Sequence, residues 1–222
     1  MKTFVISIGG SIIVPDEIDY KFLNNLKKVI LKYSKKNKII ICTGGGHTAR
    51  AYINALKKEN LPRLEQDLLG IECTRLNAHL LSFFLNLKHK IPSSLKEIKL
   101  LSKSSNIVIT GGLEPGTTSD GTTAKVAKFL KAEAMINMTN VKGLYNKDPR
   151  KFKDAKFIPQ ITHNDFDMLL SRVRQESGQH FVLDALAAKI TKESKIRVYI
   201  IQGIANLEKI LSEKMPIGTI IT

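Results

Sequence analysis

The sequence predicts an α/β fold, a three-layer αβα sandwich with a mainly parallel central sheet. Short apolar runs rich in β-branched residues alternate with longer segments of helical periodicity, as in successive βαβ units. The apolar runs are nearly continuous, which is typical of strands buried on both faces of a parallel sheet. No linker, internal repeat or low-complexity segment divides the chain. We therefore expect residues 1–222 to form one domain.

Five strands and six helices are expected along the chain. The strands are expected at residues 3–8, 38–43, 106–110, 134–139 and 196–202. The helices are expected at residues 19–33, 48–58, 65–87, 122–132, 164–174 and 183–194. Thr162 and Asp165 have capping-box spacing before the fifth helix. Residues 140–160 form a long expected loop, and long loops in compact domains are often functional.

The charge is strongly basic, with 35 Lys and Arg residues, 20 Asp and Glu residues and a formal net charge of +15. Nucleic acid, an anionic membrane and small polyanionic substrates are all compatible with such a charge. The lysines are scattered and do not alternate with aromatic residues as in single-strand binders. We interpret them as solvated surface, and the sequence does not favour a nucleic-acid partner.

The cysteines and the apolar segments bear on the compartment. Cys42 and Cys73 lie in apolar segments and are interpreted as buried thiols of a reducing compartment, and no Cys/His spacing suggests zinc. The first apolar stretch is interrupted by Gly9-Gly10 and lacks a small-residue cleavage site, which excludes a signal peptide. No apolar run approaches the length of a membrane span. We expect a cytoplasmic protein without a membrane partner and without a metal site made of protein ligands alone.

Three expected strands end in glycine clusters: IGGS at 8–11, TGGGHTAR at 43–50 and TGGLEPGTTSDG at 110–121. The carboxyl ends of parallel strands share one edge of the sheet, where ligands bind. Glycines there let backbone N–H groups converge on an anion beside the positive ends of the following helices. One such cluster is commonplace at a strand-to-helix turn, but three favour a phosphate site. Neither a Walker A loop nor GxGxxG after the first strand is present, so the site would be assembled from separate loops.

Two charged residues near these clusters are candidates for catalysis. Arg50 could offer a fork of donors to a phosphate; it could also be a solvent-exposed helix residue, but its place just past a glycine triplet favours the functional interpretation. Asp120 could hold cationic side chains, or Mg²⁺ through water, or could simply be the N-cap of the next helix. His47 is interpreted as a loop residue, because transfer to an already ionised phosphate needs no general base.

Several longer segments carry a resemblance to a known family. They occur in the same order in the amino-acid kinase superfamily, and together they resemble its UMP kinases of the archaeal type: TGGGHTARAYI, DLLGIECTRLNAHLL, TGGLEPGTTSD, TNVKGLYNKDPRKFKDAKFIP and LDALAAKI. The match extends from Ile8 to about Ile200. The glycine clusters are shared across the superfamily, whereas DLLGI and TNVKGLYNKDP are more specific to UMP kinases. The resemblance implies the amino-acid kinase fold and transfer of the ATP γ-phosphoryl group to UMP with Mg²⁺, in pyrimidine nucleotide synthesis.

The resemblance also implies where the two nucleotides bind. The residues expected at ATP are Ser7, Ile8, Gly9, Gly10, Ser11, Gly46, Arg50, Thr139, Asn140, Tyr145 and Asp148. Tyr145 offers a flat face to a purine, but it could also be a rim aromatic, with Asp148 a turn former. The residues expected at UMP are Gly45, Asp67, Leu113, Glu114, Pro115, Gly116, Thr117, Thr118 and Ser119. Asp67 matches the acidic residue that contacts the ribose; its structural alternative is a helix-start carboxylate.

One departure from the family concerns the cation near the transferred phosphate. Many members carry a lysine where this chain has Ser7, and Arg50 and Lys189 are the candidates to compensate. The family forms hexamers, and residues 19–33 are a plausible contact surface. Two alternatives remain open: another small-molecule kinase of the superfamily, acting on a carboxylate or an isoprenoid phosphate, and a non-catalytic nucleotide- or nucleic-acid-binding regulator with the same fold.

Overall fold

A seven-stranded sheet forms the centre of the molecule. The computed structural model describes residues 1–147, 149, 152–175 and 182–222, so Asp148 lies outside the described residues. The strand order is β3-β2-β1-β4-β8-β9-β7, and only the β8–β9 pair is antiparallel within this sheet. The strands are β1 (Lys2–Ile8), β2 (Asn37–Thr43), β3 (Ile107–Thr110), β4 (Ala134–Met138), β7 (Gln160–Ile161), β8 (Arg197–Ile201) and β9 (Gly218–Ile221).

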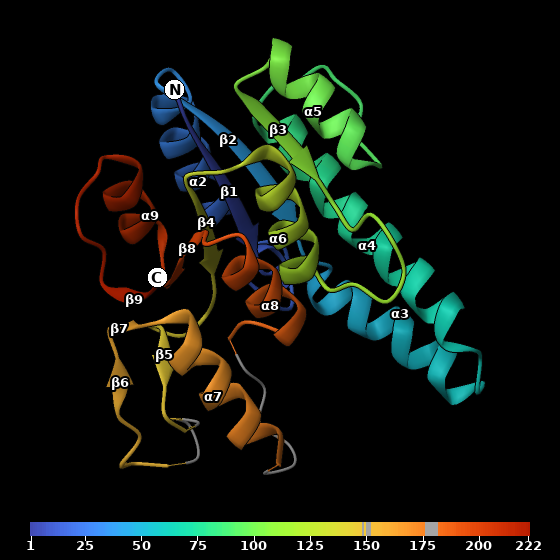
Figure 1. The fold of residues 1–222 in the computed structure, drawn as a ribbon. Helices are drawn as coiled ribbons and strands as arrows, with labels where there is room; N and C mark the ends of the chain where they lie inside the picture. Colours follow the sequence, from blue (N-terminus) through green and yellow to red (C-terminus); the bar gives the residue numbers. More distant parts are fainter. Residues whose placement is uncertain (148, 150–151, 176–181) are drawn as a thin grey trace.

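Helices cover both faces of this sheet, which confirms the predicted three-layer fold (Figure 1). One face packs against α2 (Tyr20–Tyr33), α4 (Arg63–Phe84) and α9 (Ile204–Leu211). The other face packs against α5 (Leu95–Ser104), α6 (Ser119–Leu130), α7 (His163–Gln175) and α8 (Ala185–Glu193). Two further helices follow the first two strands: α1 (Gly10–Ile13) and α3 (Gly46–Lys58), which packs along α4.

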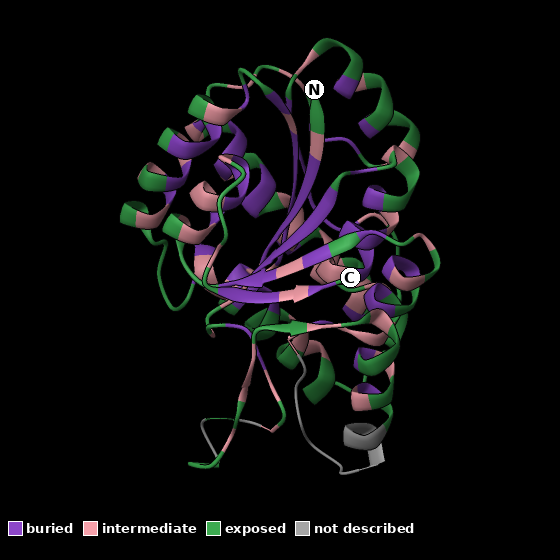
Figure 2. Cartoon of the chain, turned by 60° about the vertical axis from the view of Figure 1, so that its left-hand side comes forward, coloured by how far each residue is buried: buried purple, intermediate pink, exposed green. Residues whose placement is uncertain are grey.

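The central strand β1 shows how the sequence builds both cores at once. Its residues alternate between the faces, so Phe4, Ile6 and Ile8 join the core under α2, α4 and α9, whereas Val5 joins the core under α6 and α8. Ser7 therefore points toward the α6 side, and it is fully buried. The strands are buried along most of their length (Figure 2), as their continuous apolar runs predicted.

Several elements differ from the sequence prediction. Helices α5 and α9 and strand β9 were not predicted. The expected loop at 140–160 contains an antiparallel pair, β5 (Leu144–Tyr145) with β6 (Phe157–Ile158), and the start of β7. Helix α6 begins three residues earlier than expected because Thr118, whose hydroxyl accepts from the Gly121 N–H at 3.1 Å, is its N-cap.

The topology places a crevice at the carboxyl ends of the strands. The chain proceeds from β1 outward to β2 and β3, and then returns to place β4 on the other side of β1. Such a reversal of strand order is where ligands bind in open α/β sheets. Here the Gly9 N–H donates to the carbonyl of Met138 at 3.3 Å, so the turn after β1 is held against the end of β4.

Candidate nucleotide-binding site

The glycine clusters after β1 and β2 are in direct backbone contact. A Cβ on Gly10 would lie 1.9 Å from the backbone nitrogen of Gly46 and 2.6 Å from the carbonyl carbon of Gly44. No side chain fits at that separation, so glycine is required at this approach. Gly46 has a φ of +65°, a conformation that glycine adopts without strain. We call the three glycine clusters the first, second and third glycine corners, in chain order. The first two corners form one continuous backbone surface where α1 and α3 begin.

The third glycine cluster packs against α4 rather than against the first two. A Cβ on Gly111 would lie 2.6 Å from Thr74 Oγ1, and the Gly112 N–H donates to that same oxygen at 2.6 Å. Asn77, further along α4, donates to the Gly44 carbonyl at 2.8 Å. Helix α4 thus holds the second and third corners at a fixed separation.

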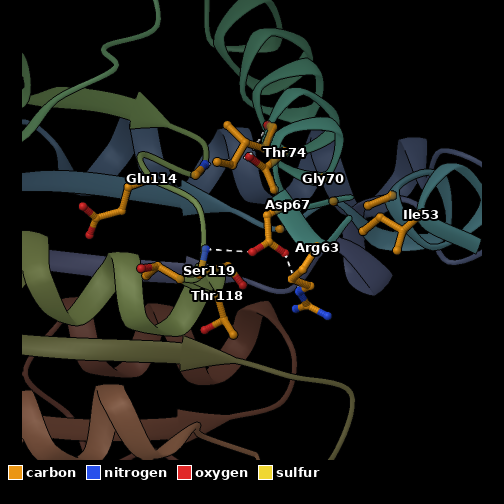
Figure 3. Close-up of a pocket in the computed structure, with 15 residues that line it drawn as sticks. Ile53, Arg63, Asp67, Gly70, Thr74, Glu114, Thr118 and Ser119 are labelled. Atoms are coloured by element: carbon orange, nitrogen blue, oxygen red, sulfur yellow. Dashed lines mark hydrogen bonds and ion pairs between the residues drawn. The ribbon is translucent and has the colours of Figure 1, made fainter. Parts of the chain in front are cut away.

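A cleft of about 240 Å³ opens between these two corners (Figure 3). The helices α3, α4 and α6 and the third glycine turn contribute its walls. Apolar groups of Ile53 and Ile71 face backbone and hydroxyl groups across it. Its lining residues are Gly44, Gly45, Ala49, Ile53, Arg63, Asp67, Gly70, Ile71, Thr74, Gly112, Glu114, Gly116, Thr117, Thr118 and Ser119.

The carboxylate of Asp67 connects two sides of this cleft. One of its oxygens accepts from the Gly116 N–H at 2.8 Å, and the other lies 2.9 Å from Nε of Arg63, one turn earlier on α4 (Figure 3). The Asp67 side chain is 17% exposed, so it remains accessible from the cleft. Asp67 lies in the second turn of α4, where the first acidic residue is Glu65. Asp67 thus lies beyond the first turn of α4, so it is not the helix-start carboxylate of the structural alternative, and it joins α4 to the loop at Gly116.

The loop from 113 to 119 lies along the opposite side of the cleft. Glu114, Gly116, Thr117, Thr118 and Ser119 line the cleft, and Lys125 of α6 contacts both the Glu114 carboxylate and the Thr117 hydroxyl. The exposed Pro115 completes the turn, and Gly116 has a φ of +74°. Leu113, by contrast, packs against the core below α6. Its side chain therefore anchors the loop.

A second polar group, deeper in the crevice, surrounds the carboxylate of Asp120. The buried Ser7 hydroxyl donates to one Asp120 oxygen at 2.9 Å, and Asn137 of β4 donates to the other at 3.3 Å. The pKa of Asp120 is raised to about 6, mainly by burial and also by the neighbouring Asp184 carboxylate, against the hydrogen bonds from Ser7 and Asn137, which lower it. Asp120 is the second residue of α6, so its interpretation as the N-cap was wrong.

Asp184 belongs to the same region. Its carboxylate accepts from the Thr118 hydroxyl and, at 2.7 Å, from the Ala187 N–H, which makes it the N-cap of α8. Asn137 also donates to the Val182 carbonyl at 2.6 Å. The starts of α6 and α8 and the end of β4 are thereby fastened together around two carboxylates. Within the described residues neither carboxylate has an ion-pair partner.

The remaining residues expected at ATP lie near the ends of β1, β4 and β5. Ile8 is fully buried, and Ser11 is half-buried on α1. The Thr139 N–H donates to the Ile201 carbonyl at 2.9 Å, and the Asn140 carbonyl accepts from the Gln202 side chain at 3.0 Å. Tyr145 is half-buried, and its ring centroid lies 5.5 Å from that of Phe157.

The candidate cations lie on α3 and α8. Arg50 is exposed one turn into α3, and it forms no ion pair with any described residue. Lys189 is exposed on α8. His47 is part of the first turn of α3, with its Nδ1 3.4 Å from an Asp16 oxygen, so the expectation that it is a loop residue was wrong.

The sequence interpretation missed several residues of the site. Arg63 could have been found from its i,i+4 spacing to Asp67. Asn137 is the single amide in the apolar run AMINM, and a polar residue inside a buried strand calls for a partner. The role of Thr74 could not be predicted from its neighbours in sequence. Its hydroxyl belongs to the site only because it accepts a hydrogen bond from the distant Gly112 N–H.

The described residues contain neither a metal-binding cluster of side chains nor a membrane-spanning helix. Among the described residues, no group of three or more His, Cys, Asp or Glu side chains is placed to hold a metal ion. A search of the described helices for one that is long and apolar enough to cross a membrane found none.

The fold and the site define a class of protein, a doubly wound α/β protein whose glycine turns line one edge of the sheet beside a cleft. The chain belongs to the amino acid kinase family, whose model matches residues 2–202. The resemblance inferred from the sequence motifs is thereby confirmed.

Named relatives and solved structures narrow this class. The chain is 37% identical to a uridylate kinase of Sulfolobus acidocaldarius, over 93% of both chains, and 36% identical to one of Archaeoglobus fulgidus, over 90% of both. The crystal structure of the A. fulgidus uridylate kinase superposes over 100% of both chains with a TM-score of 0.89 and 34% identity. A UMP kinase structure from Ureaplasma parvum has a TM-score of 0.81 and 26% identity, covering 100% of this chain and 98% of that one.

Proposed function

We propose that this protein is a nucleoside monophosphate kinase that transfers the γ-phosphoryl group of ATP to UMP, giving UDP. The observation that carries this proposal is the shared edge of the sheet. There the backbone surface of the first two glycine corners adjoins a cleft that contains an accessible carboxylate, Asp67. The names of relatives that match along nearly the whole chain agree with it.

In this proposal UMP occupies the cleft between α3, α4 and the loop 113–119. Asp67 accepts a hydrogen bond from a ribose hydroxyl, while Gly45 and the N–H and hydroxyl groups of residues 116–119 contact the base and the phosphate. Arg63, which holds Asp67 from the other side, adds positive charge at the same wall. Leu113 supports this loop from the core.

ATP would lie on the other side of the first two corners. Its phosphates would lie against the backbone of Gly9 and meet the N–H groups of Gly10 and Gly46 at the starts of α1 and α3, with Arg50 above them. Its adenosine would lie toward Thr139, Asn140 and Tyr145. The acceptor and donor phosphates then approach each other across the contact between Gly10 and Gly44.

The chemistry asks the protein for positioning and charge neutralisation. The acceptor oxygen of UMP is already ionised, so no general base is needed. Backbone N–H groups and Arg50 stabilise the charge that spreads over the transferred group. Asp120, held by Ser7 and Asn137, would fix the cations beside that group.

The carboxylates of Asp120 and Asp184 fit a magnesium ion that is held mainly by substrate phosphates. Both offer oxygen atoms, Mg²⁺ prefers oxygen ligands, and it usually takes only one or two carboxylates from a protein. When bound, the ion would neutralise charge on the phosphates. Because Ser7 supplies no ammonium group at this place, Arg50 and Lys189 remain the proposed protein cations.

The setting of the enzyme is part of the same proposal. We infer a cytoplasmic homohexamer in which residues 1–222 act as one domain, with ATP and UMP as its partners and pyrimidine nucleotide synthesis as its pathway. Helix α2 remains the proposed contact surface. Sedimentation analysis of the purified protein measures the assembly directly.

A panel of acceptors tests the substrate assignment. The purified protein is supplied with ATP and Mg²⁺ and with UMP, CMP, dUMP, acetylglutamate or isopentenyl phosphate, and ADP formation is followed in a coupled assay. We expect the highest kcat/KM with UMP. A higher value with a carboxylate or an isoprenoid phosphate would reassign the protein within its family.

A further inference from the structure

The amino edge of the sheet, opposite the candidate nucleotide-binding site, carries a second cavity. Two adjoining hollows of about 430 and 230 Å³ open there, and they share Lys2, Glu133 and Arg197 as walls. They lie where β1, β4 and β8 begin, since Ala134 pairs with Arg197 across β4 and β8 and the Glu133 N–H donates to the Thr3 carbonyl at 2.9 Å. The cavity therefore spans the three adjacent central strands.

The first hollow is strongly basic. Its charged walls are Lys2, Lys131, Lys195 and Arg197, with Glu133 as the one carboxylate. Lys2 is already paired with Glu213 at 3.0 Å, and Glu213 together with Glu133 raises the pKa of Lys2. Lys131, Lys195 and Arg197 are exposed and form no ion pair with any described residue. Three cations thus face one hollow without an ion-pair partner among the described residues, and Glu133 is the one carboxylate that lines the hollow with them.

The C-terminal ends of α6, α8 and α9 meet at this cavity, and each helix ends on a residue with positive φ. Five described non-glycine residues have positive φ: Asn60, Asn86, Lys131, Lys195 and Glu213. Asparagine tolerates this conformation, whereas other side chains adopt it at a cost. The three that are not asparagine all line the two hollows. At these helix ends, where glycine or asparagine would suit the backbone, the chain places two lysines that face one cavity.

The second hollow has a different character. Phe4, Tyr199, Ile210 and Met215 form its apolar walls, and Tyr199 is half-buried with Met215 74% exposed. It continues from the basic hollow through their shared residues. A ligand with a charged group and a flat apolar group would find a complementary wall for each.

We propose that this cavity is a second anion-binding site, specific for small molecules that carry two or more linked phosphates. The phosphates bind to Lys131, Lys195 and Arg197, whose combined charge exceeds that of Glu133. A nucleoside attached to the phosphates packs beside Tyr199 and Met215. The site lies at the opposite edge of the sheet from the glycine corners, so it is separate from the proposed transfer reaction.

A single-tryptophan reporter tests this proposal with a signal that arises beside the second hollow. The chain contains no tryptophan, so Met215→Trp places the only indole beside the second hollow. Inorganic tripolyphosphate and ATP are titrated against this protein, with its fluorescence as the readout. We expect saturable responses to both ligands. If ATP binds more tightly than tripolyphosphate, the ligand of this site is a nucleotide. If the two affinities are equal, the site recognises the polyphosphate alone.

Two variants in the reporter background separate the cavity from general charge. Lys131→Asn with Lys195→Asn removes two cations while providing a residue that suits positive φ, so the thermal midpoint should not fall. We expect the apparent affinity for tripolyphosphate to drop about tenfold or more. Lys58→Gln with Lys103→Gln removes the same charge from exposed ends of α3 and α5 and should leave the affinity unchanged.

Three results would overturn the proposal. These are the absence of any saturable response, an equal loss of affinity in both double variants, and a response to a short RNA oligonucleotide without one to tripolyphosphate. The first would mean that the lysines only neutralise the ends of α6 and α8. An equal loss of affinity in both double variants would mean that binding depends only on the net charge of the protein. A response to RNA alone would mean that this surface binds nucleic acid. None of them bears on UMP phosphorylation, which is measured separately.

Discussion

The charge on Asp120, a residue of the candidate site, is expected to lower the stability of the folded protein at neutral pH. Its carboxyl group is held between the hydroxyl of Ser7 and the amide of Asn137, without an ion-pair partner among the described residues. Burial raises its pKa from 3.8 to about 6. Above pH 6 the folded protein must keep a desolvated charge that the unfolded chain leaves in water. That cost is fully present at neutral pH and disappears as the pH falls below 4.

Replacing Asp120 by asparagine should therefore stabilise the protein at neutral pH. The shift from 3.8 to about 6 corresponds to a gain on the order of 3 kcal/mol. Thermal midpoints of the wild type and Asp120→Asn, measured from pH 4 to 7.5, should differ most at pH 7.5 and converge toward pH 4. Phosphoryl transfer should fall sharply in the same variant. A variant less stable than the wild type at pH 7.5 would contradict this account of the buried charge.

Arg50 is the first of the two cations proposed to contact the transferred phosphate. Because it is exposed and has no ion-pair partner among the described residues, Arg50→Ala should leave the fold intact. Turnover with ATP and UMP should fall about a hundredfold or more, as when one stabilising donor is lost from a transition state. Lys58→Ala, at the exposed far end of the same helix, is the matched control. Near-normal turnover in Arg50→Ala would remove this residue from the mechanism.

Asp67 is expected to recognise the ribose of the acceptor. Asp67→Asn keeps the size of the side chain but weakens its acceptance of hydrogen bonds from Gly116, Arg63 and a ribose hydroxyl. We expect KM for UMP to rise about tenfold or more. KM for dUMP should change less if Asp67 contacts the 2′-hydroxyl. Equal changes for both acceptors would exclude a contact between Asp67 and the 2′-hydroxyl, and an unchanged KM for UMP would contradict any contact with the ribose.

At the scale of elements, the contact between the turns after β1 and β2 is the least tolerant feature. Gly10→Ala would place a methyl group 1.9 Å from the Gly46 nitrogen, so α1 and α3 must move apart. We expect a loss of stability of about 1–3 kcal/mol, typical of overpacking, together with loss of activity. Gly9→Ala is the control for stability, since its Cβ would meet the nearest atom at 3.5 Å. Thermal denaturation of both variants checks this, and equal midpoints would contradict the close approach.

Some elements could be predicted from sequence because their cause is local. Strands β1, β2, β4 and β8 are continuous apolar runs, and the two core faces of β1 follow from simple alternation. Helix α5 had a usable signal that was missed, since Ser94 and Glu97 form its capping spacing. The two-residue strands β5 and β6 had none, because their pairing depends on residues more than ten positions apart.

The candidate site likewise has features that the local sequence predicts and features that depend on contacts between distant segments. The glycine corners and the polar loop 113–119 are visible as local composition. The contact of Gly10 with Gly46 and the packing of Gly112 on Thr74 depend on how separate helices meet, and no local pattern reports them. The Ser7–Asp120–Asn137 group joins three elements and was found only in the folded chain.

At the scale of the whole molecule, the sheet separates two kinds of charge distribution. Its carboxyl edge places half-buried carboxylates and backbone N–H groups beside the cleft, whereas its amino edge carries cations that form no ion pair with any described residue. The formal charge of +15 is thus compatible with small phosphate-bearing ligands at both edges, without a nucleic-acid partner.

The most direct test of the central claim is a crystal structure with UMP and a non-hydrolysable ATP analogue. The account predicts UMP in the cleft beside Asp67, with the γ-phosphate of the analogue at the N–H groups of Gly10 and Gly46 and facing the UMP phosphate. Nucleotides that bind on separate faces of the molecule, or a UMP that leaves this cleft empty, would contradict it.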